Sequence, residues 1–303
     1  MSKYFDNNSA FLEPIVTQYG FNMVMTNVTK SKKKKYVNID TRFVNEYNKS
    51  NFNHIENYVV KLPGTLREVL SVKVSQIEIP MTFFNISSSL DNNYCSLKNV
   101  TLNSTKIITI NDGNYLYSTV NFNNLGDDIT YSLDLSNNYV TFKNTSSTST
   151  YLFDFTTDPS GNYCKTNYKS KLGWLLGFRN ETYTLGPGRT IISESMMNIH
   201  TVRYLYLILD EFTNSFPNSF LSVLEDSFLN KKILARIAIN TTVYPFGSVL
   251  VGNQNNAVML SDTRNFQGKV DLHRINVSLV TEWGTSVNLN GNDFSFLLEI
   301  EHE

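Results

Sequence analysis

The sequence predicts an all-β protein in which one β module interrupts another. Strand-like runs at Tyr36–Arg42, Asn57–Lys61 and Leu66–Ile79 stop at Pro80. Aromatic residues make up 13% of the chain and charged residues only 17%. Asn contributes about 13%, and this mix favours strands joined by Asn-rich turns over helices. A second, turn-rich block follows Pro80, and strands of the first kind resume at Tyr204–Phe212.

The first part of the chain predicts an arm followed by three strands. Residues 1–35 are polar and irregular and end in a lysine run, so they are expected to form an N-terminal arm. Side chains alternate in character from Tyr36 to Asp40, as they do in a half-buried strand. Pro63-Gly64 predicts a turn before the third run. The alternation of that run slips near Gln76, which predicts a bulge in a long strand.

Short runs separated by Asn and Ser/Thr clusters predict an inserted small β-rich domain. The expected strands are Ile107–Ile110, Ile129–Leu135, Tyr139–Phe142 and Tyr151–Phe155. Asn137-Asn138 is the expected hairpin turn, because Asn tolerates positive φ. Tyr115–Leu125 is compatible with either a short helix or a loop. The block has enough aromatic residues for a core of its own.

The last third of the chain predicts five more strands of the first kind. They are Tyr204–Leu209, Ile233–Ile239, Ser248–Val251, Ile275–Thr281 and Phe294–Ile300. Ser219–Asn230 is a helix candidate, since its apolar residues recur at helical spacing. Three runs before the block and five after it describe a single eight-stranded jelly roll with an insertion in one connection. The expected boundaries are 1–35 for the arm, 36–85 and 196–303 for the jelly roll, and 86–195 for the inserted domain.

Composition and charge exclude several classes of protein. A net charge of −1 from 26 basic and 27 acidic residues excludes a globally basic nucleic-acid-binding protein. No run approaches the length of a membrane span, and the first residues have no apolar core of a signal peptide. Cys95 and Cys164 are too few for a disulfide scaffold. They could be neighbours, but free thiols in a cytoplasm are the preferred interpretation.

No residue pattern predicts catalysis, a cofactor or a metal. His54, His200, His273 and His302 are scattered and never at ligand spacing. Asp210-Glu211 and Asp271 could hold calcium, but solvated loop carboxylates are the favoured interpretation. The chain has no Gly-x-Ser-x-Gly and no phosphate loop, and none of its carboxylates forms a supported glycosidase pair. We therefore expect no enzyme, no catalytic residue, no cofactor and no metal site.

Two groups of residues are candidates for contacts with partners. Trp174, Phe178 and Arg179 lie in a leucine-rich octet; Trp174 could stack on a sugar, but a core or interface anchor is favoured. The second group is the lysine run Lys32, Lys33, Lys34 and Lys35. Each lysine could neutralise a nucleic-acid phosphate, or the run could be a solvated tail. Both interpretations stay open.

Several short segments together resemble one known family. They are Tyr36–Phe43, Leu172–Arg179 with Tyr183-Thr184, Tyr204–Leu207, Leu234–Ile237, Ser261–Arg264 and Asn288–Phe296. As an ordered series spread from Tyr36 to Ile300, they resemble the penton, or minor capsid vertex, proteins of virophages and related large DNA viruses, most of all those of mavirus-type virophages. The first 35 residues carry no such segment.

The resemblance implies a structural role and a place for the insertion. It implies an upright jelly roll with an extra domain between its fourth and fifth strands, in five copies at each icosahedral vertex. The expected partners are then the chain itself as a homopentamer, the major capsid protein and packaged DNA, with the lysine run as a contact either to the DNA or to the capsid. The expected location is the virion, assembled in the host cytoplasm. The rival functions are a carbohydrate-binding β-sandwich with a receptor or attachment role, and a β-rich hydrolase with a dispersed site.

Overall fold

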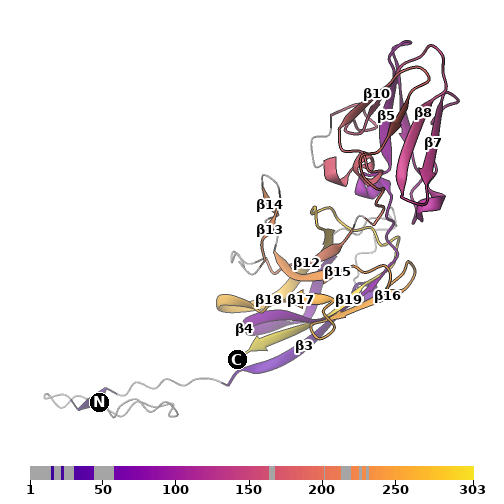
Figure 1. Ribbon diagram of the computed structural model, residues 1–303. Coiled ribbons are helices and arrows are strands. Elements are labelled where there is room, and N and C mark those ends of the chain that lie inside the picture. Colours follow the sequence, from indigo (N-terminus) through magenta and orange to yellow (C-terminus); the bar gives the residue numbers. More distant parts are fainter. Residues whose placement is uncertain are drawn as a thin grey trace.

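The computed structural model describes residues 15–16, 22–23, 31–43, 58–163, 168–200, 202–212, 220–224, 227–229 and 232–303. Within these residues the regular secondary structure is mostly strand, and the largest sheet has eight strands. They are β3 (Lys33–Asp40), β4 (Tyr58–Pro80), β12 (Tyr204–Asp210), β15 (Ile233–Ala238), β16 (Val249–Asn253), β17 (Met259–Ser261), β18 (Arg264–Thr281) and β19 (Ser295–His302). Figure 1 shows this sheet curled around itself.

The long strand β4 gives the sheet its curl, because it changes partner along one edge. Residues 58–72 pair with β18, whereas residues 76–80 pair with β16. The other edge of β4 pairs with β19 from Val69 to Glu78, and β19 in turn pairs with β3. From β18 the sheet continues through β12 and β15 to β17. Two layers result, β3-β19-β4-β16 and β4-β18-β12-β15, an arrangement compatible with a jelly roll.

An aliphatic core lies between these two layers. Val72, Val74, Ile77 and Ile79 of β4 are all fully buried, although the spacing between Val74 and Ile77 breaks the alternation. The pairing explains the break: Leu297 faces Gln76 and Leu298 faces Val74, so Ser75 is an extra residue. A β-bulge therefore keeps both halves of the strand facing inward. The bulge predicted near Gln76 is confirmed.

Three sequence predictions about local structure are wrong. Pro63-Gly64 is not a turn, because β4 continues through it. The pairing of β4 with β18 shifts there, from Lys61 opposite Arg274 to Leu66 opposite Leu272, so the proline lies in a bulge, where it is tolerated. The helix expected at Ser219–Asn230 is, in its described residues, a hairpin of β13 (Ser222–Val223) and β14 (Phe228–Leu229). The strand expected to begin at Tyr36 begins at Lys33, so three lysines assigned to the arm belong to β3. Two strands thus precede the middle block and six follow it, where three and five were expected.

Residues 86–199, which we call the middle block, form two smaller sheets. Their strands are β5 (Tyr94–Asn99), β6 (Ser104–Thr109), β7 (Ile129–Asp134), β8 (Tyr139–Asn144), β9 (Tyr151–Asp154), β10 (Thr182–Leu185) and β11 (Thr190–Ile192). One sheet has the order β10-β9-β5-β6 and the other β11-β8-β7. Among the described residues, none of these strands pairs with the eight-stranded sheet. In Figure 1 they gather beyond one end of that sheet.

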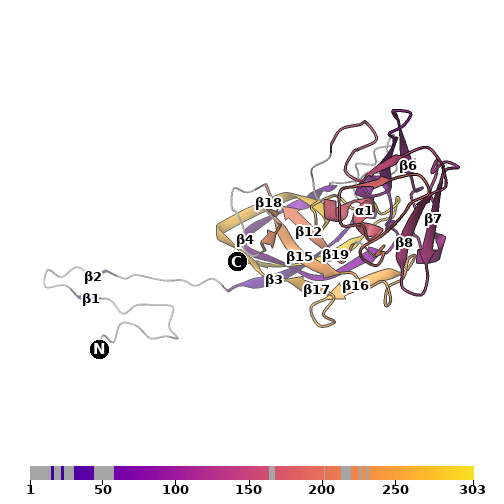
Figure 2. The ribbon, with the colours of Figure 1, turned by 45° about the horizontal axis from the view of Figure 1, so that its top comes forward.

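In the middle block, some of the details predicted from the sequence are confirmed, and one strand was missed. Asn138 has φ 59° between β7 and β8, so the expected Asn-Asn hairpin turn is confirmed. Tyr115–Leu125 is a loop with a single 3-10 turn at Tyr117–Thr119. The sequence missed β5, which pairs with both β6 and β9. The helix α1 (Leu172–Leu175) is one turn long and packs its leucines into the core, and Figure 2 shows it beside the sheets.

The remaining short strands lie before the eight-stranded sheet in the chain. β1 (Ile15–Val16) pairs with β2 (Asn22–Met23) in antiparallel fashion. The expectation of a wholly irregular arm therefore does not hold for these four residues. The other residues before Ser31 lie outside the described part of the chain, as do His54 and Cys164.

Candidate functional site

The lysine run lies on a polar ladder that covers the outer face of β3 and β19. Antiparallel register places Lys34 opposite Glu301 and Tyr36 opposite Glu299. Lys34 Nζ lies 2.5 Å from Glu299 Oε1, and Lys32 Nζ lies 3.5 Å from Glu301 Oε2. The hydrogen bond from Lys34 lowers the pKa of Glu299, and the same bond raises the pKa of Lys34. Two of the four lysines are thus engaged within the chain.

Lys33 and Lys35 point to the other face of β3 and are exposed. Val37 and Ile39 share this face and pack against the core, but the two lysines lie beyond its end. In the order of the sheet, β3 is the last strand, so one of its edges has no strand beside it in the described chain. Charged side chains at such an edge discourage unwanted strand pairing. Contact of these lysines with DNA stays a prediction.

The three residues of the leucine-rich octet separate into a core residue and a surface pair. Phe178 is fully buried and stacks on Phe142 and Phe155, with ring centroids 5.7 Å and 5.4 Å apart. Trp174 is half-buried, and the Arg179 guanidinium lies over its ring, 4.0 Å from the centroid. Arg179 also donates to the Trp174 carbonyl at 3.0 Å. One face of the indole is therefore already covered by the chain itself.

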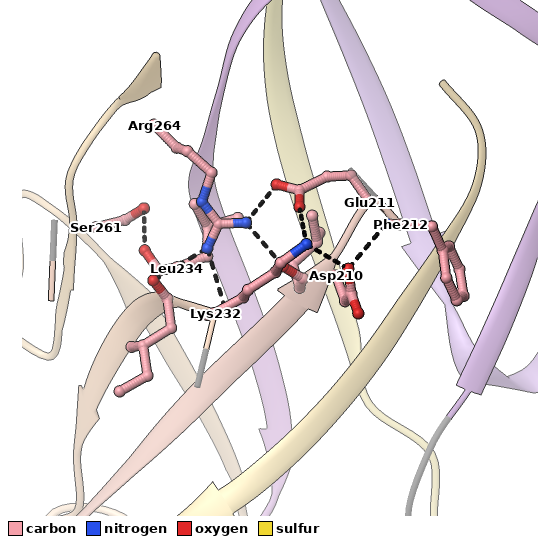
Figure 3. Close-up of polar contacts among 9 residues, drawn as sticks. Asp210, Glu211, Phe212, Lys232, Leu234, Ser261 and Arg264 are labelled. Carbon is pink, nitrogen blue, oxygen red and sulfur yellow. Dashed lines mark hydrogen bonds and ion pairs between the residues drawn. The ribbon is translucent and has the colours of Figure 1, made fainter. Parts of the chain in front are cut away.

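A buried ion network, which the sequence missed, joins three strands of the eight-stranded sheet (Figure 3). Arg264, at the start of β18, is only 2% exposed and pairs with the buried carboxylate of Glu211. Its guanidinium also donates to the carbonyls of Leu209 at 2.7 Å and Ile233 at 3.1 Å. Glu211 is therefore not the solvated carboxylate that the sequence suggested, because a buried charge needs partners of this kind.

Lys232 connects the buried Glu211 of this network to the more exposed Asp210. Its ammonium lies 2.7 Å from Asp210 Oδ1 and 3.7 Å from Glu211 Oε2. Burial disfavours the charged form of Asp210, but the hydrogen bonds from Lys232 and from the Phe212 backbone outweigh it and lower the pKa of Asp210. The network fixes the end of β12 against the starts of β15 and β18, just where the chain leaves for the β13-β14 hairpin.

That hairpin carries an apolar outer surface, which we call the hairpin patch. Its members are Leu221, Val223 and Phe228. Val223 and Phe228 face each other across the hairpin and are 77% and 56% exposed. The opposite side of the hairpin packs Leu229 onto Tyr206, Ile208 and Val280, which form the outer face of the layer containing β12 and β18.

A second apolar surface, which we call the loop patch, lies on the other layer. Its members are Val243, Phe246 and Val249, which are 61%, 48% and 54% exposed. Val249 opens β16, and Phe246 stacks on Phe84 with ring centroids 6.0 Å apart. Residues 79–90 and 237–261, which meet here, contain no Asp, Glu, Lys or Arg. That gap in charge is the signal through which the sequence could have revealed this surface.

Metal-binding clusters and membrane-spanning helices are both absent from the described residues. They contain no cluster of three or more His, Cys, Asp or Glu side chains that could hold a metal ion. Within the same residues, no helix is long and apolar enough to span a membrane. Burial raises the pKa of the Cys95 thiol, and nearby Asp154 adds to the shift, so Cys95 is a poor nucleophile.

Comparison with known proteins finds similarity among solved structures alone. No protein-family model matches the chain, and no curated protein matches its sequence. Among solved structures, the chain is similar to the crystal structure of selenomethionine-labelled mavirus penton protein, with a TM-score of 0.38 and 9% sequence identity. The match covers 90% of this chain and 100% of that one. At that score the strand pairing described above bears more directly on the fold than the match does.

Proposed function

We propose that the chain is a structural capsid protein that forms the five-fold vertex of an icosahedral DNA virus particle. The observation that carries the proposal is the order of strands in the two layers. If β4 counts as two successive strands, the layers β3-β19-β4-β16 and β4-β18-β12-β15 have the strand order of a single jelly roll. The middle block then leaves between the third and fourth strands, one connection earlier than the place where the resemblance to penton proteins expects an extra domain.

The proposed domains follow from the two separate cores. The eight-stranded sheet is the jelly roll, and residues 86–195 are an inserted domain whose core reaches Ile199. Each of the two tryptophans reports on one of them, Trp174 on the inserted domain and Trp283 on the jelly roll. Unfolding followed separately in Trp174→Phe and Trp283→Phe variants should give two midpoints. One shared midpoint, with equal denaturant dependence, would favour a single cooperative unit.

The proposed assembly is a homopentamer that contacts the major capsid protein. A five-fold vertex requires a head-to-tail contact that closes after five rotations. Isolated protein can stay monomeric if the surrounding capsid supplies part of the binding energy. We place the protein in the virion, assembled in the host cytoplasm, with a structural and non-enzymatic role.

Electron microscopy of assembled particles tests the proposal. We expect density for this chain at every five-fold vertex, with the eight-stranded sheet next to the capsid shell. Density at two-fold or general positions contradicts the proposal, as does its absence from intact particles. A variant with Lys33 and Lys35 replaced by Ser tests the DNA contact separately. If the DNA affinity of this variant and its dependence on salt concentration equal those of the unsubstituted protein, the two lysines do not contact DNA.

A further inference from the structure

Two short segments of chain connect the middle block to the eight-stranded sheet. Residues 81–85, which we call the outgoing segment, lead from Met81 in the aliphatic core of the sheet to Ile86 in the core of the middle block. Residues 200–203, which we call the linker, lead back from Ile199 in the core of the middle block to the start of β12. In Figure 1 the middle block stands beyond one end of the sheet. The direction in which it points therefore depends on how these two segments are held.

The outgoing segment is held by neutral groups. Thr82 Oγ1 donates to the Leu289 carbonyl at 2.7 Å, and Asn290 Nδ2 donates to the Thr82 carbonyl at 2.6 Å. The sequence of the outgoing segment is Met-Thr-Phe-Phe-Asn, in which no side chain gains or loses a proton near neutral pH. These two hydrogen bonds therefore keep their strength as pH changes, and the outgoing segment can act as a fixed pivot.

The linker, by contrast, is held by a carboxyl group. Glu282 directly follows the last residue of β18, and its Oε1 accepts a hydrogen bond from the Arg203 backbone N–H at 3.4 Å. The Oε2 of Glu282 is buried, and no described residue donates a hydrogen bond to it. Burying a charge without donors is costly, whereas a neutral carboxyl group loses far less when water is excluded. The position of Glu282 therefore suits a protonated carboxyl group better than an ionised one.

The charged and titratable groups around Glu282 come from the linker and from two strands. Arg203 lies on the linker, Tyr204 on β12 and Arg236 on β15, and the Arg236 guanidinium lies 4.2 Å from the centroid of the Tyr204 ring. Tyr206 adjoins Tyr204, with ring centroids 5.3 Å apart. Burial raises the pKa of Glu282, and its hydrogen bonds and the two arginines only partly offset this. Because Arg203 is exposed, an ionised carboxylate gains both water and a counter-charge by turning outward.

We propose that Glu282 is a proton-dependent latch on the linker. With a proton on its carboxyl group, Glu282 stays buried and holds the Arg203 backbone. Without that proton it turns outward and releases the linker, so that the middle block pivots on the outgoing segment. The neutral form stabilises the latched arrangement, and this stabilisation is present at low pH and is lost as pH rises through the folded-state pKa of Glu282. The motion needs only the two separate cores, so it does not depend on where the chain lies in a particle.

Hydrogen exchange of the full chain tests the latch. Protection of the linker, corrected at each pH for the intrinsic exchange rate, should fall several-fold as pH rises, with a midpoint above 4.5, the value of an unperturbed Glu carboxyl group. Glu282→Gln keeps the shape of the side chain but cannot ionise, so it should hold the higher protection at every pH. The controls are His200→Gln on the same linker and Glu78→Gln at an exposed site of β4, and both should retain the titration.

Two nitroxide labels test the motion of the middle block. Leu102→Cys and Leu260→Cys, at exposed sites of the middle block and of β17, are labelled together in a Cys164→Ser background, with Cys95 left in its buried position. The distribution of distances between the labels should broaden with rising pH, in step with the loss of linker protection. In Glu282→Gln the distribution should stay narrow throughout.

Four results would overturn the latch or the motion. Linker protection that does not vary with pH in the unsubstituted chain overturns the latch without the need for any variant, and so does a midpoint at or below 4.5. A titration that persists in Glu282→Gln, or disappears in His200→Gln, assigns the proton to another group and also overturns the latch. Linker protection that titrates while the label distances stay constant supports the latch and overturns the pivoting of the middle block.

Discussion

The hydrophobic cores of the two halves of the molecule differ in composition: one is mainly aliphatic and the other is rich in aromatic rings. The eight-stranded sheet buries mainly Val, Ile and Leu between its layers, with Phe294 and Phe296 at one end. The middle block instead packs phenylalanines ring against ring, and Phe142 contacts four other aromatic rings. Long paired strands present regular aliphatic rows, whereas short strands and loops leave irregular spaces that large rings fill. The difference indicates two separately built cores, and substitutions in one should leave the other intact.

The largest expected effect is a glycine substitution in the middle block. Gly177 has φ 95°, and a Cβ there would lie 2.0 Å from the Ser195 carbonyl oxygen. Gly177→Ala should therefore lower the Trp174-reported unfolding midpoint severely and leave the Trp283-reported midpoint unchanged. Gly188→Ala is the matched control: its φ is 66° but nothing lies within 4 Å of the new Cβ. The control should lose only about 1–2 kcal/mol. Equal losses in both variants would contradict the steric explanation.

The next largest effect is expected in the half that contains the eight-stranded sheet. Arg264→Ala leaves the buried Glu211 carboxylate without its main partner, which should cost about 3–5 kcal/mol. The loss should appear in denaturant unfolding followed at Trp283 in a Trp174→Phe background. The double variant Arg264→Met with Glu211→Leu removes both charges and should recover most of the stability. No recovery in the double variant would mean that packing, and not charge, accounts for the loss.

A smaller effect is expected from a buried amide in the middle block. Asn144 Nδ2 donates to the carbonyls of Ser149 at 2.8 Å, Leu185 at 3.2 Å and Gly186 at 3.0 Å. Asn144→Ala leaves these carbonyls without their donor and should lower the free energy of unfolding by about 1–3 kcal/mol. The loss should appear only in the unfolding followed at Trp174. Asn137→Ala, at the exposed turn, is the control. A change in the unfolding midpoint followed at Trp283 would show that the two halves do not unfold independently.

The smallest effect concerns pH. Because the folded-state pKa of Asp210 is lowered, its ionised form contributes stability above the unfolded pKa of about 4, and this contribution is lost as pH falls through the folded-state pKa. Asp210→Asn should therefore flatten the loss of stability of the eight-stranded sheet between about pH 5 and pH 2, measured by denaturant unfolding followed at Trp283 at each pH. The Trp174-reported stability should keep its own pH dependence. If the Trp283-reported stability of Asp210→Asn falls at low pH as steeply as that of the unsubstituted protein, the proposed role of Asp210 is contradicted.

Sequence patterns predicted those elements whose conformation depends on residues close by in the chain. The alternation in β4, its bulge and the Asn137-Asn138 turn depend on neighbouring residues, and all three could be read in advance. The continuation of β4 through Pro63-Gly64 could not, because it depends on β18 pairing from the far end of the chain. The helix prediction at Ser219–Asn230 failed for a related reason: apolar residues at helical spacing also suit a hairpin that rests on an apolar sheet face.

The candidate contact residues were only partly predictable. Phe178 and Trp174 stood out by composition, but sequence could not say that Arg179 covers the indole. The pairing of Arg264 with Glu211 joins residues more than fifty positions apart, so no local pattern announces it. The loop patch has a compositional signal in its missing charges, yet exposure itself depends on which face of a strand the fold turns outward.

The pairing of β3 with β19 has a consequence for how the chain is made. Residues 33–40 find their partners only at residues 295–302, and β4 waits for β18 and β19 in the same way. The partners of every strand in the middle block, by contrast, lie within it. On the ribosome the middle block can therefore fold while β3 and β4 are still unpaired, and the last strands to emerge close a sheet whose first strands were synthesised long before. Exposed lysines along β3 then keep that waiting edge soluble during translation.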